Sequence, residues 1–373
     1  MKYDVVILRS QDIVSDSRVL RYEKNYIKNN IKYQIIGWDR AHKNIKRSNT
    51  IYCRNRAGFQ KRIFGIWGRL AFNFFLFKWL LCNLHTYKCV HACDLDTILP
   101  ALCMKFFNKK VIFDIFDWYS DEFHTGYKYI DVLINTIECF CVRHSDLVII
   151  CESERLKQMM IYPKRYLVIR NMDDEYVSKG DKIEMMDNDV RDDNDDIHIT
   201  YVGGLVRHRG IIELLEIASV YPYITVSIAG FGEYKILEKV IGYSERYKNI
   251  NYYGYLQYDA ALRLMENSDL LYAMYYTSNH NHVYAAPNKF YEGLILGKPI
   301  LTNEGTLVSV LTKRYNSGFV IGEGKEDLEN FFSNVRLTLK SFTHRNTNIA
   351  VKFFLDQQKE NLDKYLEFLD SKV

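Results

Sequence analysis

The chain has 373 residues, which is long enough for two domains, and 48% hydrophobic with 26% charged residues is typical of a folded protein. Its formal charge of +4 is too small to indicate a nucleic-acid partner, and no basic run is interleaved with aromatic residues as such surfaces require. Composition therefore excludes a disordered chain and gives no support to DNA or RNA binding.

The first residues and the cysteines bear on location and metal binding. Met1 and Lys2 lead directly into YDVVILRS, an apolar run that is too short and wrongly flanked for a signal peptide. All eight cysteines precede residue 152, and none forms a C-x-x-C pair or metal-ligand spacing. We expect a cytoplasmic protein with reduced, mostly buried thiols and without a metal or other cofactor.

Short β-type runs alternate with helix-length segments through the first 170 residues. Near-continuous Val and Ile runs suit strands buried on both faces of a parallel sheet, and the intervening helices supply the crossovers. The predicted strands are residues 4–9, 33–37, 88–93, 110–115, 146–151 and 166–170. Residues 1–172 are therefore predicted to form a doubly wound, Rossmann-like α/β domain.

The most apolar segment is IFGIWGRLAFNFFLFKWLLCNL, residues 63–84. Arg69, Asn73 and Lys78 interrupt it, so it lacks the about 20 consecutive apolar residues that a membrane-spanning helix needs. Two interpretations stay open, and both can hold at once. The segment is a long helix buried against a sheet, or residues 61–84 rest their aromatic and basic side chains on an anionic membrane surface.

Residues 173–196 contain eleven Asp or Glu residues, no clear period and no motif, so we interpret them as a solvated acidic linker. The strand pattern then restarts, which predicts a second Rossmann-like domain over residues 197–345. A stripe of Leu and Tyr in residues 353–369 predicts a final helix within residues 346–373. The predicted strands of the second domain are residues 198–204, 224–230, 249–254, 269–275, 298–302 and 318–321.

Two doubly wound domains in series place a ligand between them, at the carboxyl ends of strands. The first strand of the second half is followed by Gly203 and Gly204, which allow close approach of a backbone to a ligand. Arg207 and Arg209 come next and offer forked cations that suit phosphate oxygens. This turn predicts a diphosphate ligand.

Two later motifs are weaker signals. Gly230 and Gly232 form a G-x-G, but Lys235 stands where a dinucleotide motif has a third small residue, so a nicotinamide cofactor is weakly supported. A tight turn explains these glycines equally well. Tyr255 and Leu256 follow the next strand and could sandwich a nucleobase, although packing alone would also select them.

The stretch AAPNKFYEGLILGKPI places one carboxylate, Glu292, in a nearly apolar segment. The helix dipole alone favours a glutamate in a first helical turn, so a purely structural role is the alternative to ligand binding.

Four motifs together resemble the C-terminal half of family-4-like retaining glycosyltransferases of the GT-B fold, in order and in spacing. They are YVGGLVRHRG, AGFGEY, NINYYGYLQYDAALRLMENSDLLYAMY and APNKFYEGLILGKPI. Residues 15–40, VHACDLDTILPAL, KKVIFDIFDWYSDEF and RHSDLVIICESERL are similar to parts of the family's N-terminal half. The resemblance covers roughly residues 3–335. It implies two Rossmann-like domains facing a cleft, with the C-terminal helix crossing back to the first domain.

This resemblance implies a retaining, metal-independent transfer of a sugar from a UDP- or GDP-linked donor. It further implies a saccharide acceptor, attached to a lipid carrier at the cytoplasmic membrane face, in cell-surface polysaccharide synthesis. Arg209 matches the basic residue that the family has before Gly210, while Gly204 stands at the family's other arginine position. Arg207 is our candidate substitute, so the residues predicted to act in catalysis are Arg209, Arg207 and Glu292.

Glu292 matches the second glutamate of the family's E-x7-E motif, which binds the ribose hydroxyls of the donor. Tyr284 stands at the first glutamate, which usually contacts the transferred sugar, so His282, Tyr284 and Asn288 are candidates for reading that sugar. The predicted donor site comprises Gly203, Gly204, Gly232, Tyr255, Leu256, Tyr284, Ala286, Pro287, Asn288, Lys289 and Glu292.

Four residues of the first half are candidates for the acceptor side: Asp16, Arg18, Asp94 and Asp117. Helix capping or surface placement would explain each of the three aspartates as well. Two other functions remain open: a GT-B nucleotide-sugar epimerase, and a non-catalytic nucleotide-binding partner subunit, which the residues at 204 and 284 motivate.

Overall fold

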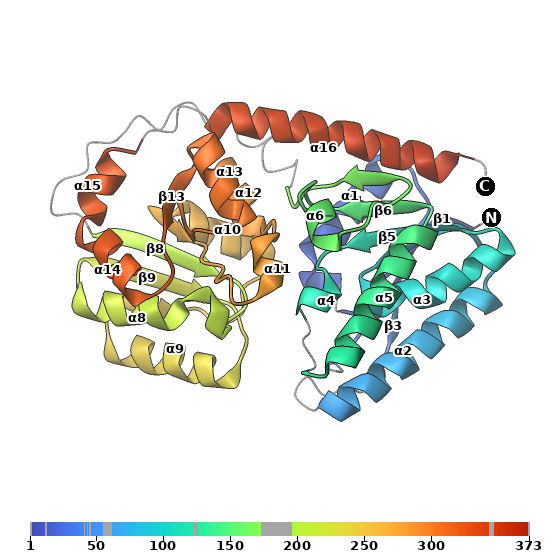
Figure 1. Ribbon diagram of the computed structural model, residues 1–373, viewed down its shortest axis with the longest axis horizontal. Helices are drawn as coiled ribbons and strands as arrows, with labels where there is room; N and C mark the ends of the chain where they lie inside the picture. The colour runs from blue at the N-terminus through green and yellow to red at the C-terminus, as the bar shows by residue number, and fades with distance from the viewer. Residues whose placement is uncertain are drawn as a thin grey trace. The chain divides into compact units, whose positions relative to one another are not determined.

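The computed structural model describes residues 2–11, 13–40, 42, 44, 46–54, 62–122, 126–172, 196–342 and 347–371. Except for Asp196, the predicted acidic linker lies outside these ranges. The chain forms two compact units: Met1–Arg170 with Gln358–Val373, and Asn171–Gln357 (Figure 1).

The first unit is built on a sheet of seven parallel strands in the order β3-β2-β1-β4-β5-β6-β7. All six strands predicted for this half are present. β3 was not predicted, because it has only four residues, three of them half-buried, and lies at the edge of the sheet. The strands are β1 (Tyr3–Leu8), β2 (Tyr33–Trp38), β3 (Thr50–Cys53), β4 (Tyr87–Cys93), β5 (Lys110–Ile115), β6 (Leu147–Ile150) and β7 (Tyr166–Val168).

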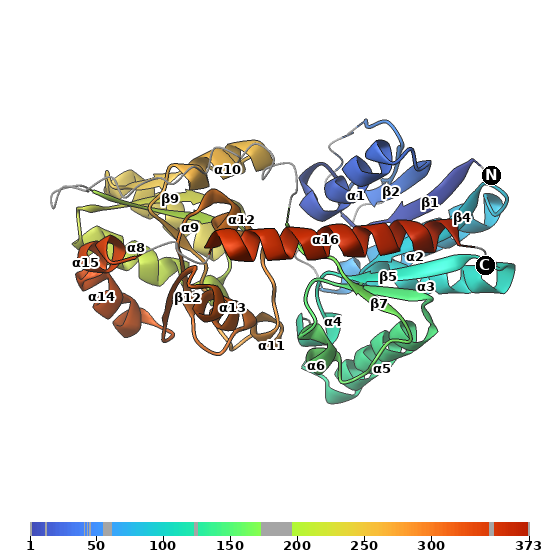
Figure 2. The ribbon, with the colours of Figure 1, turned by 90° about the horizontal axis from the view of Figure 1, so that it is seen from above.

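Helices cover both faces of this sheet. Along β1, Val6 and Leu8 belong to a core with α2, α3 and α5, whereas Val5 and Ile7 belong to one with α1 and the C-terminal part of α16 (Figure 2). This alternation is the strand period of two, and it explains the continuous apolar runs in the sequence. The helices are α1 (Ser17–Lys28), α2 (Arg62–Cys82), α3 (Leu95–Cys103), α4 (Tyr119–Glu122), α5 (Lys128–His144), α6 (Arg155–Met159) and α16 (Thr347–Asp370).

The apolar segment of residues 63–84 forms most of α2. Phe72, Leu76 and Leu80 recur at every fourth position and are fully buried against the sheet, as the buried-helix interpretation predicted. Trp67 and Phe74 lie on the outer face, each 68% exposed. Among the described helices, none combines the length and apolar character needed to cross a bilayer.

The C-terminal part of α16 is held to the first unit by buried polar groups. The Tyr365 hydroxyl bonds to that of Tyr26 and lies 2.8 Å from His91 Nδ1. Lys110 Nζ donates to the carbonyl oxygens of Phe368 (2.6 Å) and Leu369 (3.3 Å) in the last turn of α16. The last turn of the helix is therefore capped by a lysine from β5.

The eight cysteines are free thiols, five of them buried, as predicted.

The second unit has six parallel strands in the order β10-β9-β8-β11-β12-β13, and every strand predicted for this half is present. The strands are β8 (Ile197–Val202), β9 (Ile224–Ala229), β10 (Ile250–Tyr252), β11 (Leu270–Tyr272), β12 (Ile300–Asn303) and β13 (Gly318–Ile321). The helices are α8 (Ile211–Val220), α9 (Tyr234–Arg246), α10 (Tyr258–Glu266), α11 (His280–Val283), α12 (Asn288–Leu296), α13 (Leu307–Tyr315), α14 (Lys325–Ser333) and α15 (Val335–Lys340). In Figure 1, α8, α9 and α14 lie below this sheet, with α10 and α12 on its other side.

The turns that leave β8 and β9 touch through their glycines. Gly230 has a φ of +141°, and a Cβ placed on it would lie 1.8 Å from the carbonyl oxygen of Gly203. No side chain fits at this distance, so only glycine permits the two turns to approach in this way. This contact fixes the path of the chain after β8, where the arginine-rich turn begins.

We predict that Gly230→Ala lowers the melting temperature by roughly 4–8 °C, because the added methyl group forces these turns apart at a cost of about 2 kcal/mol. Gly242→Ala is the control, since it lies in α9 with no neighbouring atom within 4 Å of the new Cβ. That variant should be as stable as the parent or slightly more stable. Equal melting temperatures for the two variants in calorimetry would contradict the proposed contact.

Candidate functional site

Each sheet reverses its strand order at one place. β8 pairs with β9 on one side and β11 on the other, and β1 pairs in the same way with β2 and β4. Successive crossovers leave in opposite directions at such a point, so the loops after the two central strands diverge and open a ligand site. Predicted site residues lie at both places, since Asp94 follows β4 and Gly203, Gly204, Arg207 and Arg209 follow β8.

In the second unit, the turn after β8 is fixed by tyrosines. Tyr201 Oη donates to the carbonyl of Gly204 at 2.6 Å, and Tyr272 Oη donates to that of Gly210 at 2.7 Å. Gly210, at φ +62°, directly precedes α8, and a Cβ there would lie 2.6 Å from Tyr272 Oη. The turn between these points is thereby held in one path.

The two arginines of this turn have different surroundings. Arg209 lies over the ring of Tyr275, with its guanidinium carbon 3.8 Å from the ring centroid. Its Nη1 is buried and has no hydrogen-bond partner among the described residues. Arg207 is exposed on the same turn. Of the two arginines, Arg209 is thus the one held in place by packing on an aromatic ring.

The start of α12 brings a second cation to the same place. Lys289 is 7% exposed, and its Nζ lies 4.4 Å from the centroid of Tyr201 and 3.4 Å from Tyr275 Oη. Burial, and then the charge of Arg209, lowers the pKa of Lys289 to about 7, while Glu292 opposes this shift. Glu292 is itself 7% exposed and lies one helical turn after Lys289 on α12.

Two further predicted donor residues, Gly232 and Tyr255, follow β9 and β10 and are more exposed. Gly232 pairs with Leu205 in an isolated parallel bridge, so the second glycine of the G-x-G supports the turn after β8. Tyr255 is half exposed and packs on Phe231, with ring centroids 6.0 Å apart. Phe231 was not predicted, although its place between the two glycines could have suggested it. The pair presents an aromatic surface of the kind that stacks on a base.

The segment before α12 is ordered by its own contacts. Asn171 Nδ2 donates to the carbonyl of Ala286 at 3.0 Å, and Pro287 is the N-cap of α12. The ring of Tyr284 packs on His280. His282 is buried, its Nδ1 lies 2.9 Å from the carbonyl oxygen of Tyr276, and its ring packs against Tyr275.

Leu256, Tyr284, Pro287 and Asn288 are half-buried.

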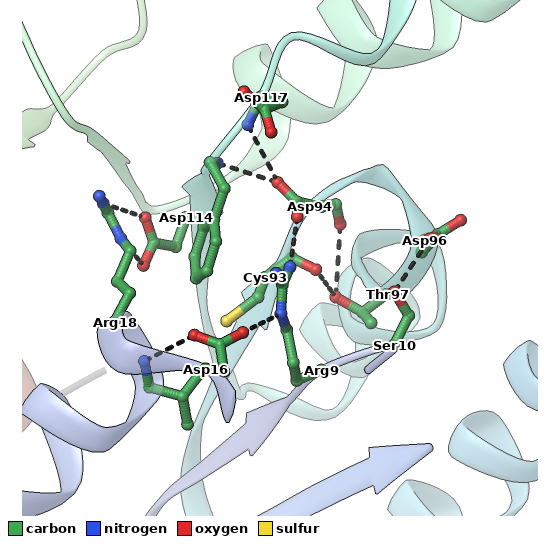
Figure 3. Close-up of polar contacts among 12 residues, drawn as sticks. Arg9, Ser10, Asp16, Arg18, Cys93, Asp94, Asp96, Thr97, Asp114 and Asp117 are labelled. Carbon is green, nitrogen blue, oxygen red and sulfur yellow. Dashed lines mark hydrogen bonds and ion pairs between the residues drawn. The ribbon is translucent and has the colours of Figure 1, made fainter. Parts of the chain in front are cut away.

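In the first unit, the acceptor-side candidates lie near the carboxyl ends of β1, β4 and β5, and two of them share a polar network (Figure 3). Arg9 joins two of them, with its Nε 2.6 Å from Asp16 Oδ2 and its Nη1 bonded to Asp94. Asp16 also caps α1 by accepting from the Val19 N–H at 3.0 Å. Arg9 was not predicted, although a charge that directly follows a buried strand is a signal for it.

Asp94 is the strained member of this network. It has φ +64° and ψ 171°, which is uncommon for any residue but glycine, and its Oδ1 accepts from the Phe116 N–H at 2.9 Å. Burial raises the pKa of Asp94 to about 6, although Arg9 opposes the shift. A partly buried, strained carboxyl of this kind is more typical of a functional site than of a core.

Arg18 and Asp117 lie on either side of that pair. Arg18 donates two hydrogen bonds to the Asp114 carboxylate, at 2.6 and 3.2 Å. Burial would raise the pKa of Asp114, but Arg18 and His91 together lower it to about 2. Asp117 is more than half exposed and lies 3.3 Å from Arg155. Arg18 thus belongs to a core ion pair, whereas Asp117 presents its carboxylate at the surface beside Asp94.

One trio in the described residues has the spacing of metal ligands: His91, Cys93 and Asp114. All three are completely buried, and the carboxylate already accepts from Arg18 and the Tyr22 hydroxyl. The trio therefore fits the hydrogen-bonded core better than it fits an ion.

The chain was compared with known proteins. No protein-family model matches the sequence, and no curated protein matches it significantly. Among solved structures, HepE of Anabaena in complex with UDP is 14% identical over 98% of this chain and 100% of HepE, with a TM-score of 0.68. The sucrose-phosphate synthase of Thermosynechococcus elongatus is 11% identical over 98% of both chains, with a TM-score of 0.69. The chain has the GT-B fold.

The GT-B prediction is therefore confirmed. A Listeria monocytogenes structure described as a UDP-N-acetylglucosamine 2-epimerase also has this fold, at 10% identity over 99% of this chain and 98% of its own, with a TM-score of 0.61. Since one fold hosts both reactions, the activity has to be argued from the site.

Proposed function

We propose that the protein is a retaining glycosyltransferase that takes a sugar from a UDP- or GDP-linked donor without a metal ion. The observation that carries the proposal is the convergence of Arg209, Lys289 and Glu292 where the turn after β8 meets the start of α12. The complex of HepE with UDP, and another with UDP-glucose, support a donor of this class.

The chemistry requires positive charge at a defined place. As the bond between the sugar C1 and the diphosphate oxygen breaks, negative charge grows on the leaving diphosphate. Arg209, held against Tyr275, and the N–H groups that begin α12 are suited to stabilise it. Because side chains supply this charge, a metal ion is not required in the proposed reaction.

The configuration at the sugar C1 is retained when the acceptor hydroxyl attacks C1 from the same face that the diphosphate leaves. The proton of that hydroxyl then passes to the departing phosphate oxygen, so the reaction needs no protein nucleophile. In this proposal Glu292 accepts hydrogen bonds from the ribose hydroxyls and so orients the donor. The aromatic pair of Phe231 and Tyr255 is positioned beside the turn that carries Gly232, where a base would stack.

We further propose a saccharide acceptor carried on a lipid, in the synthesis of cell-surface polysaccharide at the cytoplasmic face of the membrane. Asp94 and Asp117 are our candidates for contacts to acceptor hydroxyls. The outer face of α2 supports the membrane part, because Trp67, Leu70 and Phe74 are all more than half exposed there, with Lys78 one turn further on.

The similarity to the Listeria structure keeps a nucleotide-sugar epimerase as the second candidate. Conversion of a free nucleotide sugar without any acceptor would favour it. A non-catalytic partner subunit is the third candidate. Transfer of sugar by the purified protein to acceptors in a membrane fraction would exclude that one.

We predict that Glu292→Ala weakens binding of the preferred nucleotide by about ten- to a hundredfold, because two hydrogen bonds to a carboxylate are lost. A thermal-shift panel of UDP, GDP and their sugars identifies that nucleotide, and titration then gives its dissociation constant. Glu266→Ala, an exposed glutamate at the end of α10, is the control and should bind like the parent. If Glu292→Ala also binds like the parent, its assignment to the ribose is wrong.

Loss of Arg209 should affect turnover more than binding. We expect Arg209→Met to lower kcat by about a hundred- to a thousandfold with a smaller change in donor affinity, since the charge that it stabilises develops during the reaction. The exposed Arg263 of α10 provides the control variant, Arg263→Met. An equal loss in affinity and in kcat/KM, with kcat unchanged, would show that Arg209 only binds the donor.

We predict that the double variant Trp67→Ser, Phe74→Ser sediments with vesicles containing anionic phosphatidylglycerol several-fold less than the parent, because it removes two exposed aromatic anchors. Leu337→Ser, at an equally exposed apolar position of α15, should leave sedimentation unchanged. Parent protein that does not sediment with these vesicles would refute the proposed membrane contact.

A further inference from the structure

The turn after β8 lacks a side chain at the place where the resemblance expects a cation. Gly204 is exposed there, and a Cβ built on it would have no neighbouring atom within 4 Å. Arg207 lies three residues further along the turn and is also exposed. A diphosphate that contacts this turn would therefore meet Arg209 from one side and need a second cation from elsewhere.

Lys289 reaches this turn from α12. Its Nζ lies 3.0 Å from the position that a Cβ on Gly203 would take, so the ammonium group fills the space beside the residue that precedes Gly204. Any side chain at 203 would displace it. The glycine after β8 thus admits a cation from another element as well as a ligand.

We propose that Lys289, rather than Arg207, is the second cation of the diphosphate clamp and takes the place that Gly204 leaves without a side chain. The inference rests on the proposed nucleotide-diphosphate donor. It goes beyond that proposal because it assigns the clamp to a residue of α12 and makes donor binding depend on protonation.

One aromatic ring organises both cations. Arg209 stacks on Tyr275 at 3.8 Å, and Lys289 Nζ lies 5.5 Å from the same centroid and 3.4 Å from its hydroxyl. Tyr201 faces Lys289 from β8, and Glu292 acts on it from α12. His282 packs against the ring of Tyr275 as well. Among these groups one carboxylate faces two cations, so a bound diphosphate would neutralise an excess of positive charge.

Proton uptake follows from this arrangement. In the free protein the pKa of Lys289 is about 7, because of burial and the nearby Arg209. A bound diphosphate favours the charged form and raises that pKa. Below pH 7 the lysine is already protonated, so binding of the diphosphate takes up few protons. Above pH 7 each bound diphosphate has to draw a proton from solvent, and the affinity falls by up to about tenfold per pH unit.

The test is calorimetric titration of UDP at pH 8.5 in buffers with different ionisation enthalpies, which reports the protons taken up. The phosphates of UDP are fully ionised at this pH. We expect the parent to take up close to one proton per UDP. Lys289→Met should bind about tenfold or more weakly at pH 6.5 and take up none at pH 8.5. Arg207→Met and the exposed Lys239→Met on α9 should behave like the parent.

Two further measurements separate the possible failures. Lys289→Arg keeps a positive charge at every pH, so it should bind UDP without proton uptake. If the lysine had only a structural role, replacing it with arginine would not produce this combination. Uridine, which has no phosphate, should bind the parent and Lys289→Met equally.

The proposal for Lys289 is overturned if Lys289→Met keeps the affinity and proton uptake of the parent, or if Arg207→Met loses them. Failure of the parent to bind any nucleotide diphosphate would instead refute the proposed function.

Discussion

Parallel sheets with helices on both faces leave few places where polar groups can meet a ligand. Side chains along the strands are buried, so chemistry is confined to the loops at the carboxyl ends, and these loops diverge only where the strand order reverses. In this protein the two reversals lie between β1 and β4 and between β8 and β11. Arg9 and Asp94 lie at the first, and Arg209 and Tyr275 at the second. Topology thus determines where each unit can act.

The two sites differ in their charge balance. In the first unit Arg9 lies between two carboxylates and Arg18 is paired with Asp114, so the buried charges largely compensate each other. This balance is compatible with the hydroxyl-rich acceptor that we propose. In the second unit two cations share Tyr275 while Glu292 supplies one negative charge. That excess suits an anion, and, after burial, the charge of Arg209 contributes to the lowered pKa of Lys289 in the free protein.

The sequence predicted most of the fold because buried parallel strands need continuous Val and Ile runs, which are visible without any tertiary information. Only β3 was missed, since an edge strand of four half-buried residues lacks that signal. The turn after β8 was recognised because glycine and arginine have few other reasons to follow a buried strand together. Arg9 carried the same signal in YDVVILRS and could have been predicted.

Other parts of the site depend on tertiary contacts that no local pattern encodes. The sequence offered Arg207 as the second clamp residue because it lies near Gly204 along the chain, whereas Lys289 lies near Gly203 only in the folded unit. Tyr201 and Tyr275 resembled ordinary core aromatics until their contacts with the two cations were known. Site residues within one turn can thus be predicted from sequence, but the residue of another element that packs on that turn cannot.

A crystal structure with bound UDP tests the central claim most directly. The account predicts diphosphate oxygens within hydrogen-bonding distance of the Arg209 guanidinium and the Lys289 ammonium, with the ribose hydroxyls on Glu292. A diphosphate held by Arg207 while Lys289 stays against Tyr201, or a ribose that makes no contact with Glu292, would contradict it.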